Sequence, residues 1–198
     1  MHGKIGAVAE LIANPGADGA GGVVAVHRSG EHSFSKATEQ MITLRAGMGV
    51  EGDAHFGARV KHRSRVRIDP EQPNLRQVHL LHRELFDQVA AAGFSVSPGD
   101  LGENITSEGL DLLALPVGTT LRIGREAIVV LTGLRNPCQQ INDFKPGLLN
   151  EVRERTDHGE IVRKAGVMGV IVQSGSVAPG DEIRVALPPE PHSPLDCV

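Results

Sequence analysis

The stretch LDLLALPVGTTLRIGREAIVVLTGLR, residues 110–135, decides the fold class. It contains two or three short apolar runs separated by Pro-Val-Gly and by Ile-Gly-Arg, a spacing that is typical of strands joined in hairpins. Similar short runs occur elsewhere in the chain, over residues 4–13, 22–29, 41–45 and 76–81. The sequence therefore predicts a mostly β, strand-rich, barrel-like domain with a few peripheral helices, rather than a doubly wound sheet.

Two segments have the spacing of short helices. In HRELFDQVAAAG, residues 82–93, the apolar residues share one face, and Gly93 is a typical helix stop. FKPGLLNEVRERT, residues 144–156, carries Pro146 in its expected first turn. We expect both helices to lie outside the barrel.

The end of the chain divides into two parts. The segment GVMGVIVQSGSVAPGDEIRVAL, residues 166–187, is expected to close the fold as a hairpin of two strands. Residues 188–198 are rich in proline and are expected to form a disordered tail. We therefore predict a single domain over residues 1–187, followed by this tail.

Composition excludes several classes of function. The 198 residues are 40% apolar but contain no Trp and no Tyr, so the core must be aliphatic. The net charge of −4 gives no electrostatic case for nucleic-acid binding, and no apolar run approaches the roughly 18 residues of a membrane span. The two cysteines, Cys138 and Cys197, do not form the pattern of a disulfide framework, which favours a reducing, cytoplasmic location.

Cys138 follows the apolar run that ends in Arg135, Asn136 and Pro137, and a polar loop is expected to follow it. A cysteine acts as nucleophile or metal ligand only as the thiolate, and a folded-back Arg135 could favour that form. The alternative is a buried, inert cysteine, since cysteine is among the most commonly buried residue types. The residues alone leave both interpretations open. Cys197 lies in the expected tail, and we predict no role for it.

Two further motifs are candidate sites. GVEGDAHFG, residues 49–57, places Asp53 and His55 where they could bind a metal, an anion or each other. PGDLGENIT, residues 98–106, places Glu103 and Asn104 after a glycine turn that lets the backbone come close to a ligand. Each motif alone is equally compatible with a structured turn. Patterns for a structural zinc site or a hydrolase nucleophile elbow do not occur.

Together these segments resemble the MOSC domain, which is found at the C-terminus of molybdenum-cofactor sulfurases and alone in small bacterial proteins. Three motifs occur in the order of the family and carry the resemblance: Gly52-Asp53-x-His55, Gly102-Glu103-Asn104-x-Thr106 and Pro137-Cys138. The similarity spans roughly residues 4–187. The fold that it implies is a strand-rich barrel, in agreement with the strand pattern.

The resemblance also implies a ligand and a site. The ligand is molybdenum cofactor, a phosphate-bearing molybdopterin, and Cys138 would ligate the metal or carry sulfur as a persulfide. The residues that would bind the cofactor are Gly52, Asp53, His55, Gly102, Glu103, Asn104, Thr106 and Arg135. A basic residue from residues 59–67 could also meet the phosphate.

Three functions follow from this implied site. In the first, the protein is a molybdenum-dependent oxidoreductase that reduces N-hydroxylated small molecules with electrons from a donor protein. In the second, Cys138 accepts sulfur from a cysteine desulfurase, because this chain has no room for the pyridoxal-phosphate domain of the full sulfurases. In the third, the protein is a non-catalytic module that binds or delivers the cofactor. A homodimer is one oligomeric state compatible with all three.

Overall fold

The computed structural model describes residues 19–61, 66, 67 and 69–198. The strand expected over residues 4–13 lies outside these described residues. Within them, no helix has the length and apolar character needed to cross a membrane.

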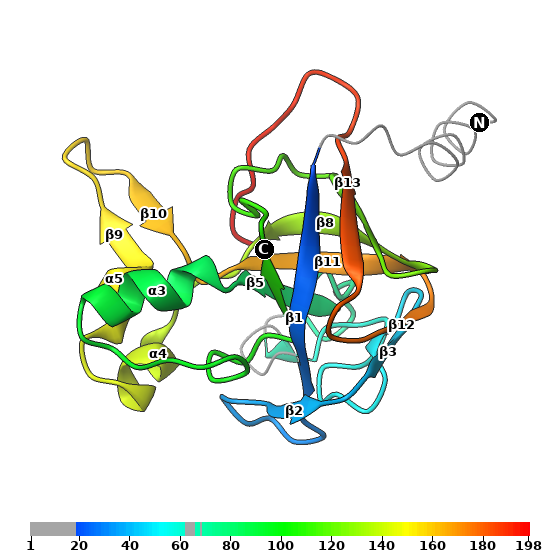
Figure 1. The fold of residues 1–198 in the computed structure, drawn as a ribbon, viewed down its shortest axis with the longest axis horizontal. Helices are drawn as coiled ribbons and strands as arrows, with labels where there is room; N and C mark the ends of the chain where they lie inside the picture. Colours follow the sequence, from blue (N-terminus) through cyan, green and yellow to red (C-terminus); the bar gives the residue numbers. More distant parts are fainter. Residues whose placement is uncertain (1–18, 62–65, 68) are drawn as a thin grey trace.

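Seven strands close into a barrel (Figure 1). Around the barrel they are β1 (Ala20–Arg28), β13 (Glu182–Ala186), β7 (Thr120–Ile123), β8 (Ala127–Leu134), β11 (Val167–Gln173), β5 (Val78–His82) and β6 (Ile105–Glu108), which returns to β1. Neighbouring strands are antiparallel except for the parallel pair β5 and β6. The predicted mostly β, barrel-like fold with few helices is confirmed.

The barrel interior is aliphatic, as the composition requires. Val, Leu and Ile side chains from every barrel strand form one buried cluster, which includes Val26, Leu80, Ile105, Leu121, Val129, Ile171 and Ile183. The stretch that decided the fold class forms the β7–β8 hairpin, with Gly124 in the left-handed region at φ +60°. Its first apolar run is a loop rather than a strand, and Leu112 from that loop is buried in the same cluster.

The remaining strands lie outside the barrel wall. Strand β2 (Ala37–Glu39) extends the sheet beside β1. Strands β3 (Ile42–Arg45), β4 (Gly49–Val50) and β12 (Gly175–Val177) form a separate three-stranded sheet. Strands β9 (Arg153–Arg155) and β10 (Ile161–Arg163) form a hairpin.

Three short helices lie together on one side of the barrel (Figure 1): α3 (Glu84–Ala91), α4 (Gln139–Phe144) and α5 (Leu148–Val152). They pack around a second apolar cluster that contains Leu85, Ile141 and Leu148. Helix α3 was expected. Helix α4 replaces the expected polar loop, because burial of Ile141 holds this polar segment against the cluster. Helix α5 is shorter than expected at both ends. It begins at Leu148, after Pro146 and the left-handed Gly147, and it ends at Val152 because the chain becomes extended at Arg153 and continues as β9.

The expected closing hairpin over residues 166–187 is wrong. Strand β11 lies between β5 and β8, and β13 lies between β7 and β1, so the barrel separates them. The reason is β12, which pairs with β3 and buries Val177, and which carries the chain away before β13 begins.

The tail over residues 188–198 was expected to be disordered, but its last residues, from Leu195 to Val198, pack against the barrel, while residues 189–194 are exposed. The Leu134 N–H donates to the Asp196 carbonyl oxygen at 2.8 Å, and Leu195 is 8% exposed within the barrel cluster. Gly133 permits this approach, because a Cβ there would collide with the Asp196 carbonyl oxygen. Burial of Leu195 and the backbone hydrogen bond to Leu134 thus order the end of the tail, although its prolines prevent a regular helix or strand.

Replacing Leu195 by Ala should lower the free energy of unfolding by about 2 kcal/mol, the low end for a buried leucine. The reason is the loss of apolar contacts at the end of the barrel. Urea unfolding followed by circular dichroism measures the change. A difference within experimental error would show that the tail is not docked.

Candidate functional site

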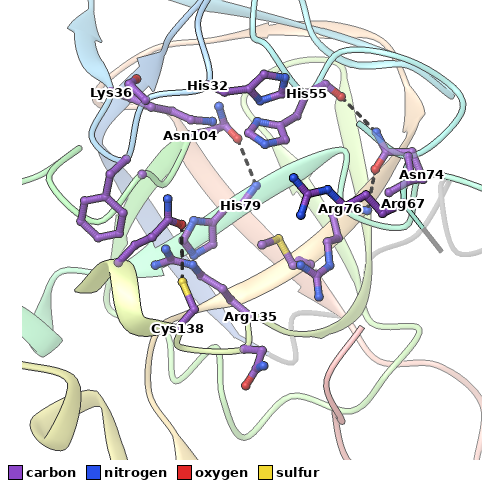
Figure 2. Close-up of a pocket in the computed structure, with 17 residues that line it drawn as sticks. His32, Lys36, His55, Arg67, Asn74, Arg76, His79, Asn104, Arg135 and Cys138 are labelled. Carbon is purple, nitrogen blue, oxygen red and sulfur yellow. Dashed lines mark hydrogen bonds between the residues drawn. The ribbon is translucent and has the colours of Figure 1, made fainter. Parts of the chain in front are cut away.

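A cavity of about 470 Å³ lies beside the ends of β5 and β8 and collects side chains from segments far apart in sequence. Figure 2 shows Cys138 and Arg135 at one end, Arg67 and Arg76 at another, and His79 between them. The lining residues are His32, Ser33, Phe34, Lys36, His55, Val60, Arg67, Asn74, Arg76, His79, Gly102, Asn104, Arg135, Asn136, Cys138, Gln140 and Met168.

The Cys138 thiol lines this cavity and is half-buried. The residue lies between the end of β8 and α4, in an extended conformation with φ −123° and ψ 173°. Its Sγ donates to the Gln140 side-chain oxygen at 3.5 Å. This thiol is therefore accessible from the cavity and is not sealed in hydrocarbon.

Arg135 lies beside Cys138 and presents its guanidinium to the same cavity. Its backbone N–H donates to the Gly166 carbonyl oxygen at 3.0 Å, and its Cζ lies 5.8 Å from the Phe34 ring centroid. Burial lowers the pKa of Arg135, while the nearby Cys138 and Glu103 oppose that shift. In the described part of the chain, its buried Nη1 has no hydrogen-bond partner, so it remains available to an acceptor on a ligand.

Lys36 contributes a second cation through a buried ion pair. Its Nζ lies 2.6 Å from Asp53 Oδ2, and the two side chains are 6% and 2% exposed. Burial alone would raise the pKa of Asp53, but hydrogen bonds from His55 and the charge of Lys36 outweigh it and hold the pKa well below its usual range. Burial also lowers the pKa of Lys36, against the effect of Asp53. Asp53 is therefore an ionised carboxylate that positions Lys36.

Asn104 connects this pair to the barrel. Its side-chain Nδ2 donates to Asp53 Oδ2 at 3.0 Å and to the His27 carbonyl oxygen at 3.1 Å, while its Oδ1 accepts from the His79 backbone N–H at 3.2 Å. Both side-chain polar atoms are thus used within the protein. We infer that Asn104 holds the ends of β1 and β5 together at the wall of the cavity.

Glu103 and Thr106, two further predicted residues, lie behind that wall. Glu103 is fully buried, and its Oε1 accepts from the Gly99 N–H at 2.6 Å and from the Thr106 hydroxyl at 3.0 Å. Burial raises the pKa of Glu103, against those hydrogen bonds. Neither residue is among those that line the cavity.

The two predicted glycines differ in position. Gly102 lines the cavity at φ +81°, and a Cβ there would collide with the Phe34 carbonyl oxygen. Gly52, at φ +79°, instead packs against the Arg28 side chain. Of the predicted site residues, the structure places Cys138, Arg135, His55, Gly102 and Asn104 on the cavity, whereas Gly52, Asp53, Glu103 and Thr106 are not among its lining residues.

Sequence reasoning missed several lining residues. Arg67 belongs to the basic stretch from which we expected one anion contact, but Lys36, Arg76 and His79 belong to no motif. His79 Nε2 lies 2.8 Å from the Ala165 carbonyl oxygen, and burial lowers its pKa well below the usual value, so the imidazole is neutral. The one signal in the sequence was the alternation of polar and apolar residues over residues 76–81, which predicted a strand there but did not mark His79 as a site residue.

The charge of the cavity contrasts with that of the whole protein. Four of the lining residues are Lys or Arg, and none of the described lining residues is Asp or Glu, although the net charge of the protein is −4. Such a cavity favours an anionic ligand. Among the described residues, no cluster of three or more His, Cys, Asp or Glu side chains could hold a metal ion. A metal bound at Cys138 would therefore need further ligands from a molecule that arrives with it.

Comparison with known proteins gives a consistent result. The model of the MOSC domain family matches residues 42–184. The crystal structure of the YUAD protein from Bacillus subtilis is similar, with 23% identity, a TM-score of 0.67 and coverage of 88% of this chain and 97% of that one. YiiM from Escherichia coli is similar at 17% identity, with a TM-score of 0.55 and coverage of 87% and 73%. These two likenesses concern the fold alone. A comparison with curated proteins gives no match.

Proposed function

The chain belongs to the MOSC domain family, and from this premise we propose that it binds molybdenum cofactor in the cavity, with the Cys138 thiolate as the ligand that the protein gives to the metal. One observation carries the proposal. A half-buried thiol and four cationic side chains line the same cavity, and its described lining contains no carboxylate.

The residues present fit this group. The volume of about 470 Å³ is typical of a small-molecule site, which commonly measures about 300–1,000 Å³. The unpaired Arg135 Nη1, with Lys36 and Arg76, supplies donors for a phosphate. Molybdenum held by dithiolene sulfur favours another soft ligand, and Cys138 is the one thiol on the cavity lining.

When bound, the cofactor supplies a metal that can exchange two electrons with a substrate. The chain itself would hold the phosphate with Lys36, Arg76 and Arg135 and would hold the metal with the Cys138 thiolate. The reaction that suits this arrangement is reduction of an N-hydroxylated small molecule. Electrons must come from a donor protein, because the chain shows no flavin or haem signature.

Sulfur transfer is the second candidate, and the accessibility of the Cys138 sulfur favours it. In that reaction the Cys138 thiolate attacks the terminal sulfur of a persulfide on a cysteine desulfurase. The donor S–S bond breaks, a new S–S bond forms on Cys138, and the donor cysteine leaves as a thiolate. No net oxidant is needed.

Purification from a host that makes molybdenum cofactor tests the proposal. We expect molybdenum and pterin to copurify with the protein in a ratio close to one per chain, measured by elemental analysis and by fluorescence of the oxidised pterin. Turnover of an N-hydroxylated base with an electron donor then separates an oxidoreductase from a delivery module. Absence of both metal and pterin, together with a gain of one sulfur on Cys138 after incubation with desulfurase and cysteine, would instead support the carrier function.

A further inference from the structure

A chain of hydrogen bonds runs from the surface to the fully buried Glu103 behind the cavity. Thr38 Oγ1 lies 3.2 Å from His27 Nδ1, His27 Nε2 lies 3.2 Å from Thr106 Oγ1, and Thr106 Oγ1 lies 3.0 Å from Glu103 Oε1. Thr38 is exposed, whereas His27, Thr106 and Glu103 are each 0% exposed. The chain therefore connects solvent to a carboxyl group that solvent does not reach directly.

The chemistry of the four groups gives this chain a direction. An ionised Glu103 only accepts, so Thr106 donates to it and must accept from His27 Nε2–H. His27 Nδ1 then accepts from the Thr38 hydroxyl. Burial lowers the pKa of His27 to about 4, so the imidazole is neutral at neutral pH and can pass a proton from one nitrogen to the other. Every donor thus points from solvent toward Glu103.

Glu103 also lies close to the two cations nearest to it in the cavity wall. Gly99 joins the backbones of these segments, because its carbonyl oxygen accepts from the Lys36 backbone N–H at 2.9 Å and its N–H donates to Glu103 Oε1 at 2.6 Å. Lys36 and Arg135 both lie within electrostatic reach of the Glu103 carboxyl group. The other charged or titratable groups around this network are His27, Asp53, His79 and Asp100.

Burial raises the pKa of Glu103, whereas hydrogen bonds from Gly99 and Thr106 and the charge of Arg135 oppose that shift. Its Oε2 is buried and, within the described residues, has no hydrogen-bond partner, so no hydrogen bond favours the charged form at that oxygen. An anion in the cavity would lie beside Arg135 and Lys36, which line it, and would add a like charge near the carboxylate. A nearby like charge favours the protonated acid.

We propose that Glu103 takes up one proton when an anion occupies the cavity and releases it when the anion leaves, through Thr106, His27 and Thr38. The inference rests on the proposed function only in requiring an anionic ligand, whatever its identity. In the uptake step, solvent gives a proton to Thr38, each hydroxyl or ring nitrogen passes one proton on, and the last proton forms the O–H bond on Glu103. Because linkage is reciprocal, anion affinity should fall by up to tenfold per pH unit where the free protein has Glu103 ionised.

Proton uptake can be measured directly in a pH-stat. Sodium sulfate is the probe, added to weakly buffered protein between pH 6 and 9, with sodium chloride of equal ionic strength as the reference. We expect sulfate to cause proton uptake by the wild type, and we expect Glu103→Gln to take up fewer protons, by up to one per chain. The matched control is Glu108→Gln, an exposed carboxyl at the end of β6, the strand that follows Glu103, and it should behave as the wild type. Arg76→Gln should lower sulfate affinity and proton uptake together, because Arg76 lines the cavity.

A second measurement does not depend on how the variant folds. On addition of sulfate, the infrared difference spectrum of the wild type should gain the C=O stretch of a protonated carboxyl group. Equal uptake in the wild type and Glu103→Gln, or no such band in the wild type, would overturn the inference. Either result leaves the proposed function intact, since that is decided separately by the molybdenum and pterin content.

Discussion

Cys138→Ser protein, purified from a host that makes molybdenum cofactor, should carry at least about tenfold less molybdenum than the wild type and show no measurable turnover. Loss of a group that only supports a metal ligand lowers metal affinity or activity about 10–100-fold. Cys138 is proposed as the ligand itself, so its loss should have at least this effect. A hydroxyl holds its proton and is a hard donor, whereas the thiolate is the soft ligand that molybdenum favours. Elemental analysis and turnover of an N-hydroxylated base measure the two losses.

The variant should fold normally, because serine is close to isosteric and Cys138 is only half-buried. Its matched control is Cys197→Ser, which changes the other half-buried cysteine and should keep the metal content and activity of the wild type. Wild-type molybdenum in Cys138→Ser would show that the cationic lining holds the cofactor without the sulfur. A large loss in Cys197→Ser would show that the C-terminal segment affects the site.

The fold could be predicted because its signals are local. The β7–β8 hairpin follows from Ile-Gly-Arg between two apolar runs, and α3 follows from the spacing of Leu85, Phe86 and Val89 and from Gly93 after its end. Errors arose where long-range packing overrode local composition. Leu195 anchors a proline-rich tail, and Ile141 turns a polar segment into α4. Neither effect is visible without the barrel against which these side chains pack.

The site was predicted only in part, because local motifs reveal some of its residues and long-range packing brings in the others. Motifs found Cys138, Arg135, His55, Gly102 and Asn104, which line the cavity. The cations Lys36 and Arg76 reach it from a loop before β2 and from the segment before β5, and no spacing rule connects those segments. The Gly-Asp-x-His and Gly-Glu-Asn-x-Thr motifs also mix lining residues with residues that support them. Sequence order alone cannot show that Asp53 acts through Lys36.

Asp53 does not line the cavity, but Asp53→Ala is nevertheless expected to destabilise the protein strongly. Removing one partner from a buried ion pair costs about 3–5 kcal/mol, because the other charge stays buried without compensation. Lys36 is 6% exposed and lies 2.6 Å from Asp53. Since Lys36 borders the cavity and can turn toward it, we expect a loss near the lower limit, about 3 kcal/mol in the free energy of unfolding. Urea unfolding at neutral pH measures it.

The dependence on pH gives an independent check of the same pair. The pKa of Asp53 is held below its unfolded value, so its stabilising effect is complete above about pH 5 and is lost progressively as the pH falls toward the folded pKa. The wild type should thus lose stability on acidification more steeply than Asp53→Ala. The double variant Asp53→Ala with Lys36→Met removes both charges, and it should recover part of the loss because no unpaired charge remains. If the double variant is as unstable as the sum of the single variants, the buried ion pair is not the source of the effect, and Asp53 acts through its hydrogen bonds to Asn104 and His55 instead.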